Sequence, residues 1–297
     1  MSKPNPYQRR LSLLRTDAQR LPDDELGAAF RRRLEAGIHG LSFSPYSEGQ
    51  EPGTEIDAGQ IRDRLSIIAP YVSWIRSFSC TEGNELIPAI AHEMGLKTLV
   101  GAWIGDDPEK NELEMNGLIE LAGQGHVDIM AVGNEVLLRE EQSDDELIGY
   151  IERARSAVPN VPVGYVDAYF LFVDHPRVTE ACDVLLANCY PFWEGCPADY
   201  ATLYMKDMFR RVRNVAGGKK IIVSETGWPD KGTAFGAAEP STANAIRYFL
   251  NTYDWADEDD IEIFYFAAFD EDWKVGAEGD VGAYWGLWDK YGELKYG

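Results

Sequence analysis

Ile221-Ile222-Val223-Ser224-Glu225-Thr226-Gly227-Trp228-Pro229 is an apolar run that ends in a carboxylate. Three branched apolar residues in a row are typical of a strand buried on both faces, as in a parallel sheet, and the glycine and proline that follow would end it. Because burying a lone carboxylate is costly, Glu225 is either paired with a cation or held ready for chemistry. Taken alone, a helix N-cap or a salt bridge would explain it equally well.

A second stretch, Asp128-Ile129-Met130-Ala131-Val132-Gly133-Asn134-Glu135, has the same design and also ends in a glutamate. Glu135 and Glu225 are 90 positions apart, which fits three strand-plus-helix units of about 30 residues each. If these units belong to one closed barrel, both carboxylates reach its C-terminal mouth. Two carboxylates that face each other across a cleft are the usual equipment for breaking a glycosidic bond.

Length and charge limit the classes of function. With 297 residues and 45% hydrophobic content, the chain can bury the core of one large domain. Its formal net charge of −22 argues against nucleic acid and anionic membranes as partners, since both would be repelled. A neutral substrate fits this charge, although solubility or life in high salt also explains it.

Cysteines and histidines give no sign of a metal site. The four cysteines include no CxxC pair, so we expect buried free thiols, with a disulfide among the last three as the alternative. The four histidines do not fall together at predicted strand ends: His39, His92, His126 and His175. We therefore expect no metal and no cofactor, and a metal-dependent barrel enzyme is the weaker alternative.

The ends of the chain bear on its location. The N-terminal basic residues have no apolar run behind them, and no stretch approaches about 18 apolar residues. We expect a soluble chain without a signal peptide or membrane contact. It would be cytoplasmic, or a domain cut from an exported or membrane-bound parent.

Apolar runs alternate with helical patterns along most of the chain. The predicted strands cover residues 40–46, 72–78, 97–104, 128–132, 161–166, 184–188, 221–225 and 261–269. Eight strands alternating with helices predict an α/β fold with a single (β/α)8 TIM barrel over residues 38–297. Residues 1–37 are expected to form a loose polar arm and a short amphipathic helix that closes the bottom of the barrel.

The ends of the fourth and seventh predicted strands resemble a known family. Val132-Gly133-Asn134-Glu135 and Ser224-Glu225-Thr226-Gly227-Trp228-Pro229 are similar to the acid/base and nucleophile motifs of glycoside hydrolase family 17. This family contains β-1,3-glucanases and β-1,3-glucanosyltransferases, and the likeness is to bacterial members. Further matches run from Ser44-Pro45-Tyr46 to Gly286-Leu287-Trp288-Asp289, so the resemblance covers about residues 38–297.

The resemblance implies that Glu225 attacks the anomeric carbon while Glu135 protonates the departing oxygen. An acid that works near neutral pH must keep its proton, and a neighbouring carboxylate raises its pKa. Once Glu225 is esterified, Glu135 becomes the stronger acid and can act as a base toward the acceptor. Retention at the sugar requires the two carboxyl groups roughly 5–5.5 Å apart, and we predict that separation here.

Neighbouring residues have candidate supporting roles. The family's wider clan implies that Asn134 hydrogen-bonds the sugar 2-hydroxyl, although an Asn after Gly also makes turns. Tyr190 is expected to donate to Glu225, or else to satisfy a backbone carbonyl. Tyr46 is a candidate for sugar contact. Arg76 is a candidate for carboxylate support, although a strand arginine can pair with any acid.

The segment that closes the eighth strand, Phe269-Asp270-Glu271-Asp272-Trp273-Lys274, resembles the family's Glu and Lys pair. Glu271 and Lys274 would then support the catalytic acids, and a surface ion pair of little consequence is the alternative. Four tryptophans follow predicted strands: Trp103, Trp193, Trp228 and Trp273. Aromatic faces at the mouth suit sugar rings, while core packing explains any single one of them.

These observations favour a retaining glycosidase-type enzyme that cleaves β-1,3-glucan, with a β-glucan or gluco-oligosaccharide as its partner. The nearest alternative is a glucanosyltransferase, in which a sugar replaces water as acceptor. A carbohydrate-binding barrel without activity is the alternative from another class, since barrels host unrelated functions. Because both acids and their neighbours are intact, this last alternative is the weakest of the three.

Overall fold

The computed structural model describes residues 21–297, so the expected arm at residues 1–20 lies outside the described part of the chain. Eight parallel strands follow one another around a closed barrel in chain order. They are β1 (Ile38–Ser42), β2 (Val72–Ser77), β3 (Lys97–Ala102), β4 (Ile129–Asn134), β5 (Val163–Ala168), β6 (Val184–Asn188), β7 (Lys220–Thr226) and β8 (Ile263–Tyr265). The predicted (β/α)8 barrel is confirmed.

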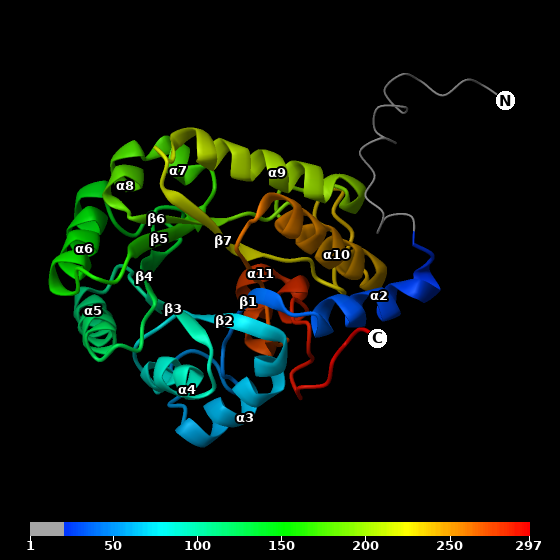
Figure 1. The fold of residues 1–297 in the computed structure, drawn as a ribbon, viewed down its shortest axis with the longest axis horizontal. Coiled ribbons are helices and arrows are strands. Elements are labelled where there is room, and N and C mark those ends of the chain that lie inside the picture. The colour runs from blue at the N-terminus through cyan, green and yellow to red at the C-terminus, as the bar shows by residue number, and fades with distance from the viewer. Residues whose placement is uncertain (1–20) are drawn as a thin grey trace.

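Helices form the outer ring of the barrel (Figure 1). They are α2 (Asp23–Glu35), α3 (Ala58–Ile68), α4 (Ile87–Glu93), α5 (Pro108–Gly123), α6 (Asp144–Ala157), α7 (Leu171–Asp174), α8 (Pro176–Ala181), α9 (Ala198–Val215) and α10 (Thr242–Asp259), whereas the short α11 (Val275–Glu278) lies inside this ring. The start of α6 is a capping box, in which Ser143 and Glu146 satisfy each other's backbone N–H groups. None of the described helices is long and apolar enough to cross a membrane.

Strand β8 is shorter than the sequence pattern predicts. The apolar run continues to Phe269, but the strand ends at Tyr265. Beyond it, the N–H groups of Phe266 and Ala268 still donate to β7 and β1, whereas the N–H of Ala267 donates to the carbonyl of Trp285 in the C-terminal segment at 3.0 Å. The apolar pattern reports burial, and burial continues after the strand has ended.

The short N-terminal helix is present, but it does not lie across the bottom of the barrel. Helix α2 packs along α10 on the outside (Figure 1). The Phe30 ring lies 4.7 Å from the Phe249 ring and 5.2 Å from the Tyr296 ring, centroid to centroid. Because only short helical turns follow β8 within residues 266–297, α2 fills the position in the ring that the eighth helix would take.

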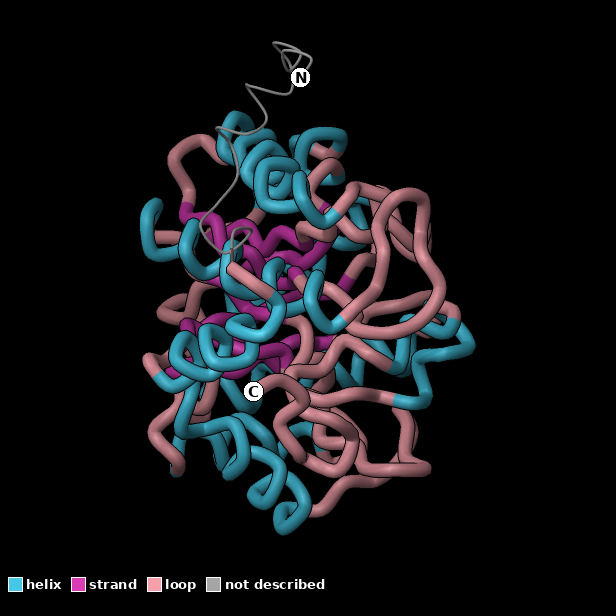
Figure 2. The backbone as a smooth tube through the Cα atoms, turned by 90° about the vertical axis from the view of Figure 1, so that its right-hand side faces the viewer, coloured by secondary structure: helices cyan, strands magenta, loops and turns pink. Residues whose placement is uncertain are grey.

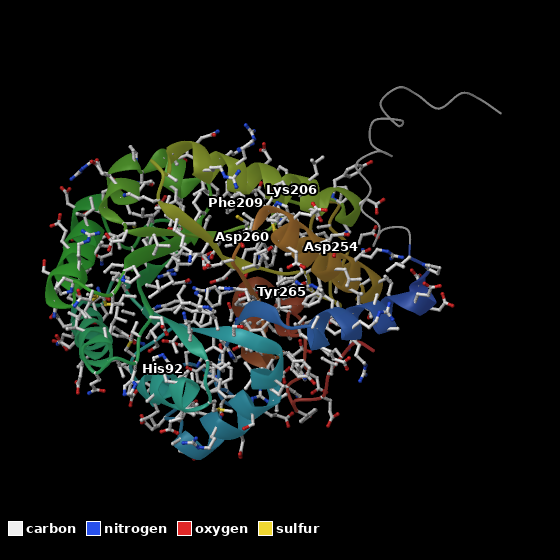
Figure 3. All side chains as sticks on the ribbon, viewed as in Figure 1. His92, Lys206, Phe209, Asp254, Asp260 and Tyr265 are labelled. Carbon is white, nitrogen blue, oxygen red and sulfur yellow. The ribbon has the colours of Figure 1, made fainter. Side chains whose placement is uncertain are left out.

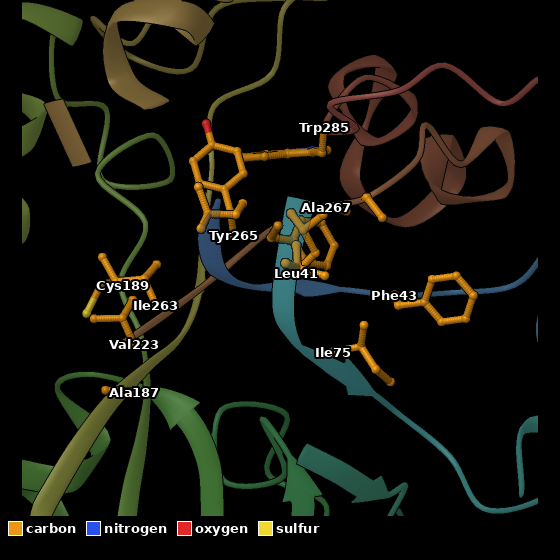
Figure 4. Close-up of a cluster of buried hydrophobic side chains, with 14 of the residues drawn as sticks. Leu41, Phe43, Ile75, Ala187, Cys189, Val223, Ile263, Tyr265, Ala267 and Trp285 are labelled. Atoms are coloured by element: carbon orange, nitrogen blue, oxygen red, sulfur yellow. The ribbon is translucent and has the colours of Figure 1, made fainter. Parts of the chain in front are cut away.

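The hydrophobic core has two layers, because alternate strand residues face opposite sides of the barrel wall. The larger layer lies between strands and helices, and Figure 4 shows part of it around Leu41, Val223 and Tyr265. The inner layer fills the barrel and consists of Leu99, Ile129, Ala131, Val166, Val184, Leu186, Ile222 and Phe264. The barrel is therefore a packed core.

Long connections gather at one end of the barrel. The segments 43–57 and 227–241 follow strands, whereas the segments that lead into β3 and β7 from the preceding helices, 94–96 and 216–219, are short. Figure 2 shows the loops concentrated on one side of the strands. Since all eight strands are parallel, their carboxyl ends share one side, which is where barrel enzymes place their active sites.

Replacing Phe30 with alanine should lower the free energy of unfolding by about 3–5 kcal/mol, because the ring is fully buried against α10 and Tyr296. Urea unfolding followed by circular dichroism measures the change. Arg32→Ala, on an exposed position of the same helix, is the control and should change stability by about 0.5 kcal/mol or less. An F30A protein as stable as its parent would show that α2 does not help to complete the barrel.

Candidate active site

Glu225 lies near the end of β7 and is 6% exposed. Its Oε1 accepts a hydrogen bond from Nη1 of Arg76 at 2.5 Å, and its Oε2 accepts one from the hydroxyl of Tyr190 at 2.7 Å. Arg76 comes from β2 and is itself only 2% exposed. Both oxygens thus have a donor, and one donor is a full cation, which is the arrangement that a buried carboxylate needs.

Glu135 directly follows β4, where the backbone is irregular. The pairing of β4 with β5 shifts register between Ala131 and Asn134. Gly133 has φ +81°, and a Cβ there would lie 2.7 Å from a methyl group of Val136, so this position requires glycine. Glu135 itself has φ +53°, and its N–H donates to the carbonyl of Val166 at 2.8 Å. The irregularity sets the direction in which the Glu135 side chain leaves the strand.

A chain of polar contacts joins the two glutamates. Arg76 donates to Oδ1 of Asn134 through Nη2 at 2.6 Å, so its guanidinium bridges Glu225 to the residue before Glu135. The amide of Asn188 donates to Oε1 of Glu135 at 2.8 Å. Asn188 lies at the end of β6 and faces the same mouth of the barrel. Sequence analysis did not single it out, although its place in Asn188-Cys189-Tyr190-Pro191, at the end of a predicted strand, was a signal that could have identified it.

Burial and the charge of Glu225 raise the pKa of Glu135 to about 7, while the hydrogen bond from Asn188 and the charge of Arg76 oppose this shift. Glu135 can therefore hold a proton near neutral pH. Burial, followed by the charge of Glu225, raises the pKa of Tyr190 well above its usual value. Tyr190 consequently stays protonated and remains a donor to Glu225. The pair has the electrostatics of a proton donor beside a nucleophile.

Glu135 and Glu225 line one cavity of about 370 Å³. Tyr190 and Trp193 line it too, as the sequence led us to expect of mouth residues. Aromatic residues that the sequence did not single out complete much of the wall: Tyr169, Phe170, Phe266 and Trp285. A third carboxylate, Glu278, also lines the cavity, and burial raises its pKa to about 7. Apolar faces beside a few polar groups suit a sugar chain.

A second pocket contains other residues from the sequence-based set. Tyr46, Glu271 and Trp273 line it, and the Tyr46 and Trp273 rings meet edge to face at 6.2 Å. Glu271 and Lys274 form an ion pair of 2.7 Å, and both are buried, which excludes the surface pair considered as an alternative. The Lys274 ammonium lies 4.0 Å from the ring centroid of Phe266, which lines the cavity of the two glutamates.

Two of the tryptophans do not line either pocket. Trp228 is 1% exposed and its indole donates to the carbonyl of Glu239 at 3.0 Å, so the expectation that it offers a face to sugar is wrong. It packs on Phe192 instead and supports the loop after β7. Trp103 is 36% exposed, with the guanidinium of Arg139 4.8 Å above its ring.

Of the four histidines, His92 and His126 lie near each other, with ring centroids 5.9 Å apart. His92 lies by α4 at the outside of the barrel (Figure 3) and bonds Asp128 at 2.9 Å. His175 bonds Asp144 at 2.7 Å. Within residues 21–297, no group of three or more His, Cys, Asp or Glu side chains is arranged to hold a metal ion. The four cysteines are free thiols.

Glu225→Gln should lower the pKa of Glu135 from about 7 toward that of an ordinary glutamate, because it removes the negative charge that disfavours ionisation of Glu135. Titration of carboxyl ¹³C chemical shifts by NMR measures this pKa directly. Glu109→Gln, an exposed change on α5, is the control and should leave it unchanged. An identical Glu135 titration in E225Q and the parent would mean that the two carboxylates do not interact.

Known proteins are similar to this chain in sequence and in fold. Residues 40–286 match the family model of the BtgE/BtgC glycoside hydrolase domain. The chain is 32% identical over 252 residues to a glucan 1,3-beta-glucosidase of Schizosaccharomyces pombe, covering 78% of each protein. It is 26% identical over 269 residues to a glucan 1,3-beta-glucosidase of Saccharomyces cerevisiae, covering 82% of this chain and 86% of that protein.

Solved structures agree. The glycoside hydrolase family 17 β-1,3-glucanosyltransferase of Rhizomucor miehei is similar with a TM-score of 0.79 and 27% identity, over 88% of this chain and 96% of that one. An active-site mutant of the same enzyme in complex with laminaritriose gives a TM-score of 0.78 at 26% identity, with the same coverage. The chain therefore belongs to glycoside hydrolase family 17 and carries its BtgE/BtgC glycoside hydrolase domain.

Proposed function

We propose that this protein is a retaining glycosidase-type enzyme that cleaves β-1,3-glucan through a covalent glycosyl-enzyme intermediate. The observation that carries the proposal is the pair of carboxyl groups in one cavity: Glu225 has a cation and a hydroxyl as donors, and Glu135 has a pKa of about 7. The substrate class comes from the relatives, which are glucan 1,3-beta-glucosidases and a β-1,3-glucanosyltransferase.

In the first half of the reaction, a carboxylate oxygen of Glu225 forms a bond to the anomeric carbon. The bond from that carbon to the glycosidic oxygen breaks, and the proton of Glu135 goes to the departing oxygen. Arg76 and Tyr190 hold Glu225 in place. Because these donors stay in place when Glu225 becomes a neutral ester and the negative charge passes to the deprotonated Glu135, they also orient the ester for the second half.

In the second half, burial still raises the pKa of Glu135, but Glu225 no longer adds its charge to that effect. Glu135 then becomes the stronger acid and exists as a carboxylate, which removes a proton from the incoming acceptor. The acceptor oxygen bonds the anomeric carbon as the ester bond to Glu225 breaks. The configuration at the sugar is thus retained, and we keep the prediction of roughly 5–5.5 Å between the two carboxyl groups.

The acceptor decides between hydrolysis and transfer. Water gives hydrolysis, and a sugar hydroxyl gives a longer chain. The glucanosyltransferase of Rhizomucor miehei supports transfer as the second candidate, since it matches 88% of this chain. The aromatic wall of the cavity, which includes Trp193 and Trp285 packed 5.6 Å apart, also offers surface to a sugar acceptor. A carbohydrate-binding barrel without activity has no use for a buried carboxyl group with a raised pKa beside a second one held by an arginine and a tyrosine.

Glu225→Gln should reduce turnover of a β-1,3-glucan oligosaccharide by several orders of magnitude, because shape is kept and the nucleophile is lost.

Glu135→Ala should behave differently. With an aryl glycoside, whose leaving group needs no proton, this variant should still form the glycosyl-enzyme. Added azide should then restore turnover with a β-glycosyl azide as product. Steady-state kinetics and product analysis separate the two variants. If azide restored turnover of E225Q with a β-configured product, Glu225 would not be the nucleophile, and the roles assigned to Glu225 and Glu135 would be wrong.

Incubation of the protein with laminaripentaose tests the reaction as a whole. We expect oligosaccharides shorter than the substrate, which chromatography with mass spectrometry would resolve, and the E225Q protein serves as the control. Products longer than five units would establish transfer to a sugar acceptor. An unchanged pentaose with active protein preparations would contradict the assignment to β-1,3-glucan.

A further inference from the structure

Asn188 occupies a particular place between the two glutamates. It is the last residue of β6 and is 2% exposed. The register shifts at this point, so that Asn188 pairs with Glu225 on β7 after Ala187 has paired with Val223. The shift places the Asn188 side chain at the polar end of the barrel interior, beside the cavity that it lines together with Glu135.

A hydrogen bond from Ser224 fixes the orientation of the Asn188 amide. The hydroxyl of Ser224, which is fully buried, donates to Oδ1 of Asn188 at 2.8 Å. Since Oδ1 accepts from Ser224, the NH₂ group of the same amide faces Glu135 and donates to its Oε1 at 2.8 Å. An amide NH₂ can only donate. Oε1 of Glu135 is therefore always an acceptor, whatever the protonation state of the carboxyl group.

This contact determines which oxygen of Glu135 carries the proton. A carboxylic acid whose Oε1 accepts a hydrogen bond keeps its proton on Oε2. No residue of the 21–297 segment donates to Oε2, so that oxygen is left for a substrate in the cavity. In the proposed reaction the proton then passes from Oε2 to the glycosidic oxygen and, in the second half, from the acceptor back to Oε2.

The same contact acts against the other groups around Glu135. Burial, Glu225 and Asp167 favour its protonated form, whereas Arg76 and the Asn188 amide favour its ionised form. Tyr190, which also lines the cavity, stays neutral. An acid that later serves as a base needs some groups that favour its protonated form and others that favour its ionised form. The Asn188 amide, held against Oε1, favours the ionised form.

We propose that Asn188, held by Ser224, is the positioning residue of the acid/base: it binds Oε1 of Glu135, directs the proton to Oε2 and favours the carboxylate that the second half of the reaction requires. This inference rests on the function proposed above. It adds a residue that acts through Glu135 and does not touch the reacting atoms.

Asn188→Ala tests the inference in two measurements. The pKa of Glu135, followed by carboxyl ¹³C NMR, should rise by roughly one unit, because a hydrogen bond that favours the ionised form is lost. Since Glu135 must be protonated in the free enzyme, kcat/KM falls as pH rises through its pKa, and this alkaline limb should move upward by the same amount. With an aryl glycoside, the second step should slow at least tenfold while the first step changes less.

Two further variants separate positioning from a general structural effect. Ser224→Ala leaves Asn188 in place but frees its amide, so the pKa and the alkaline limb should move in the same direction by a smaller amount. Asn111→Ala is the matched control: Asn111 is also buried, but it bonds the backbone of Gly105 on the β3 side of the barrel. It should lower stability without moving either pH measurement.

The outcomes distinguish this inference from the proposed function. The NMR titration needs no substrate, so an unchanged Glu135 pKa in both N188A and S224A overturns the role of Asn188 even if the protein cleaves glucan. A raised pKa with an unmoved alkaline limb overturns it as well. If N188A does not fold, S224A alone decides, and a Glu135 pKa in S224A equal to that of the parent contradicts the inference.

Discussion

Arg76 donates to Glu225 with one nitrogen of its guanidinium and to Asn134 with the other, at a depth where an unpaired carboxylate would be costly to bury. Among side chains, only the planar guanidinium of arginine can donate in this way from two nitrogens at once while carrying a positive charge. The contact neutralises Glu225 and ties β7 to the segment that ends in Glu135. Without it, Glu225 would be a buried carboxylate without a cation, and the two motifs would share no hydrogen-bond partner.

The closed barrel makes this contact geometrically available. Arg76, Asn188 and Glu225 come from β2, β6 and β7, which are far apart in the chain, and the parallel order brings their inward side chains to one end. The apolar inner layer below them excludes water and strengthens each polar contact. Beyond the glutamates, aromatic side chains line the cavity, and Trp285 from the C-terminal segment lies beside Tyr190. Fold, electrostatics and binding surface therefore depend on the same closure.

Much of this arrangement could be predicted from the sequence, for identifiable reasons. Buried parallel strands appear as continuous apolar runs, so the number and order of strands were readable, and Glu225 and Glu135 marked the ends of two of them. Other features depended on geometry that a pattern does not contain. The role of Asn188 depends on a register shift within the β6–β7 pairing. The burial of Trp228 depends on how its loop folds back onto Phe192.

The central claim is that the reaction passes through an ester between the anomeric carbon and Glu225. An activated 2-deoxy-2-fluoro glucosyl or laminaribiosyl substrate forms such an ester quickly and releases it slowly, so that the intermediate accumulates. Mass spectrometry of the intact protein followed by peptide mapping then locates the label. The account predicts one sugar unit per chain attached to Glu225; a label on any other residue, or normal consumption of the substrate by a chain that lacks this carboxylate, would contradict it.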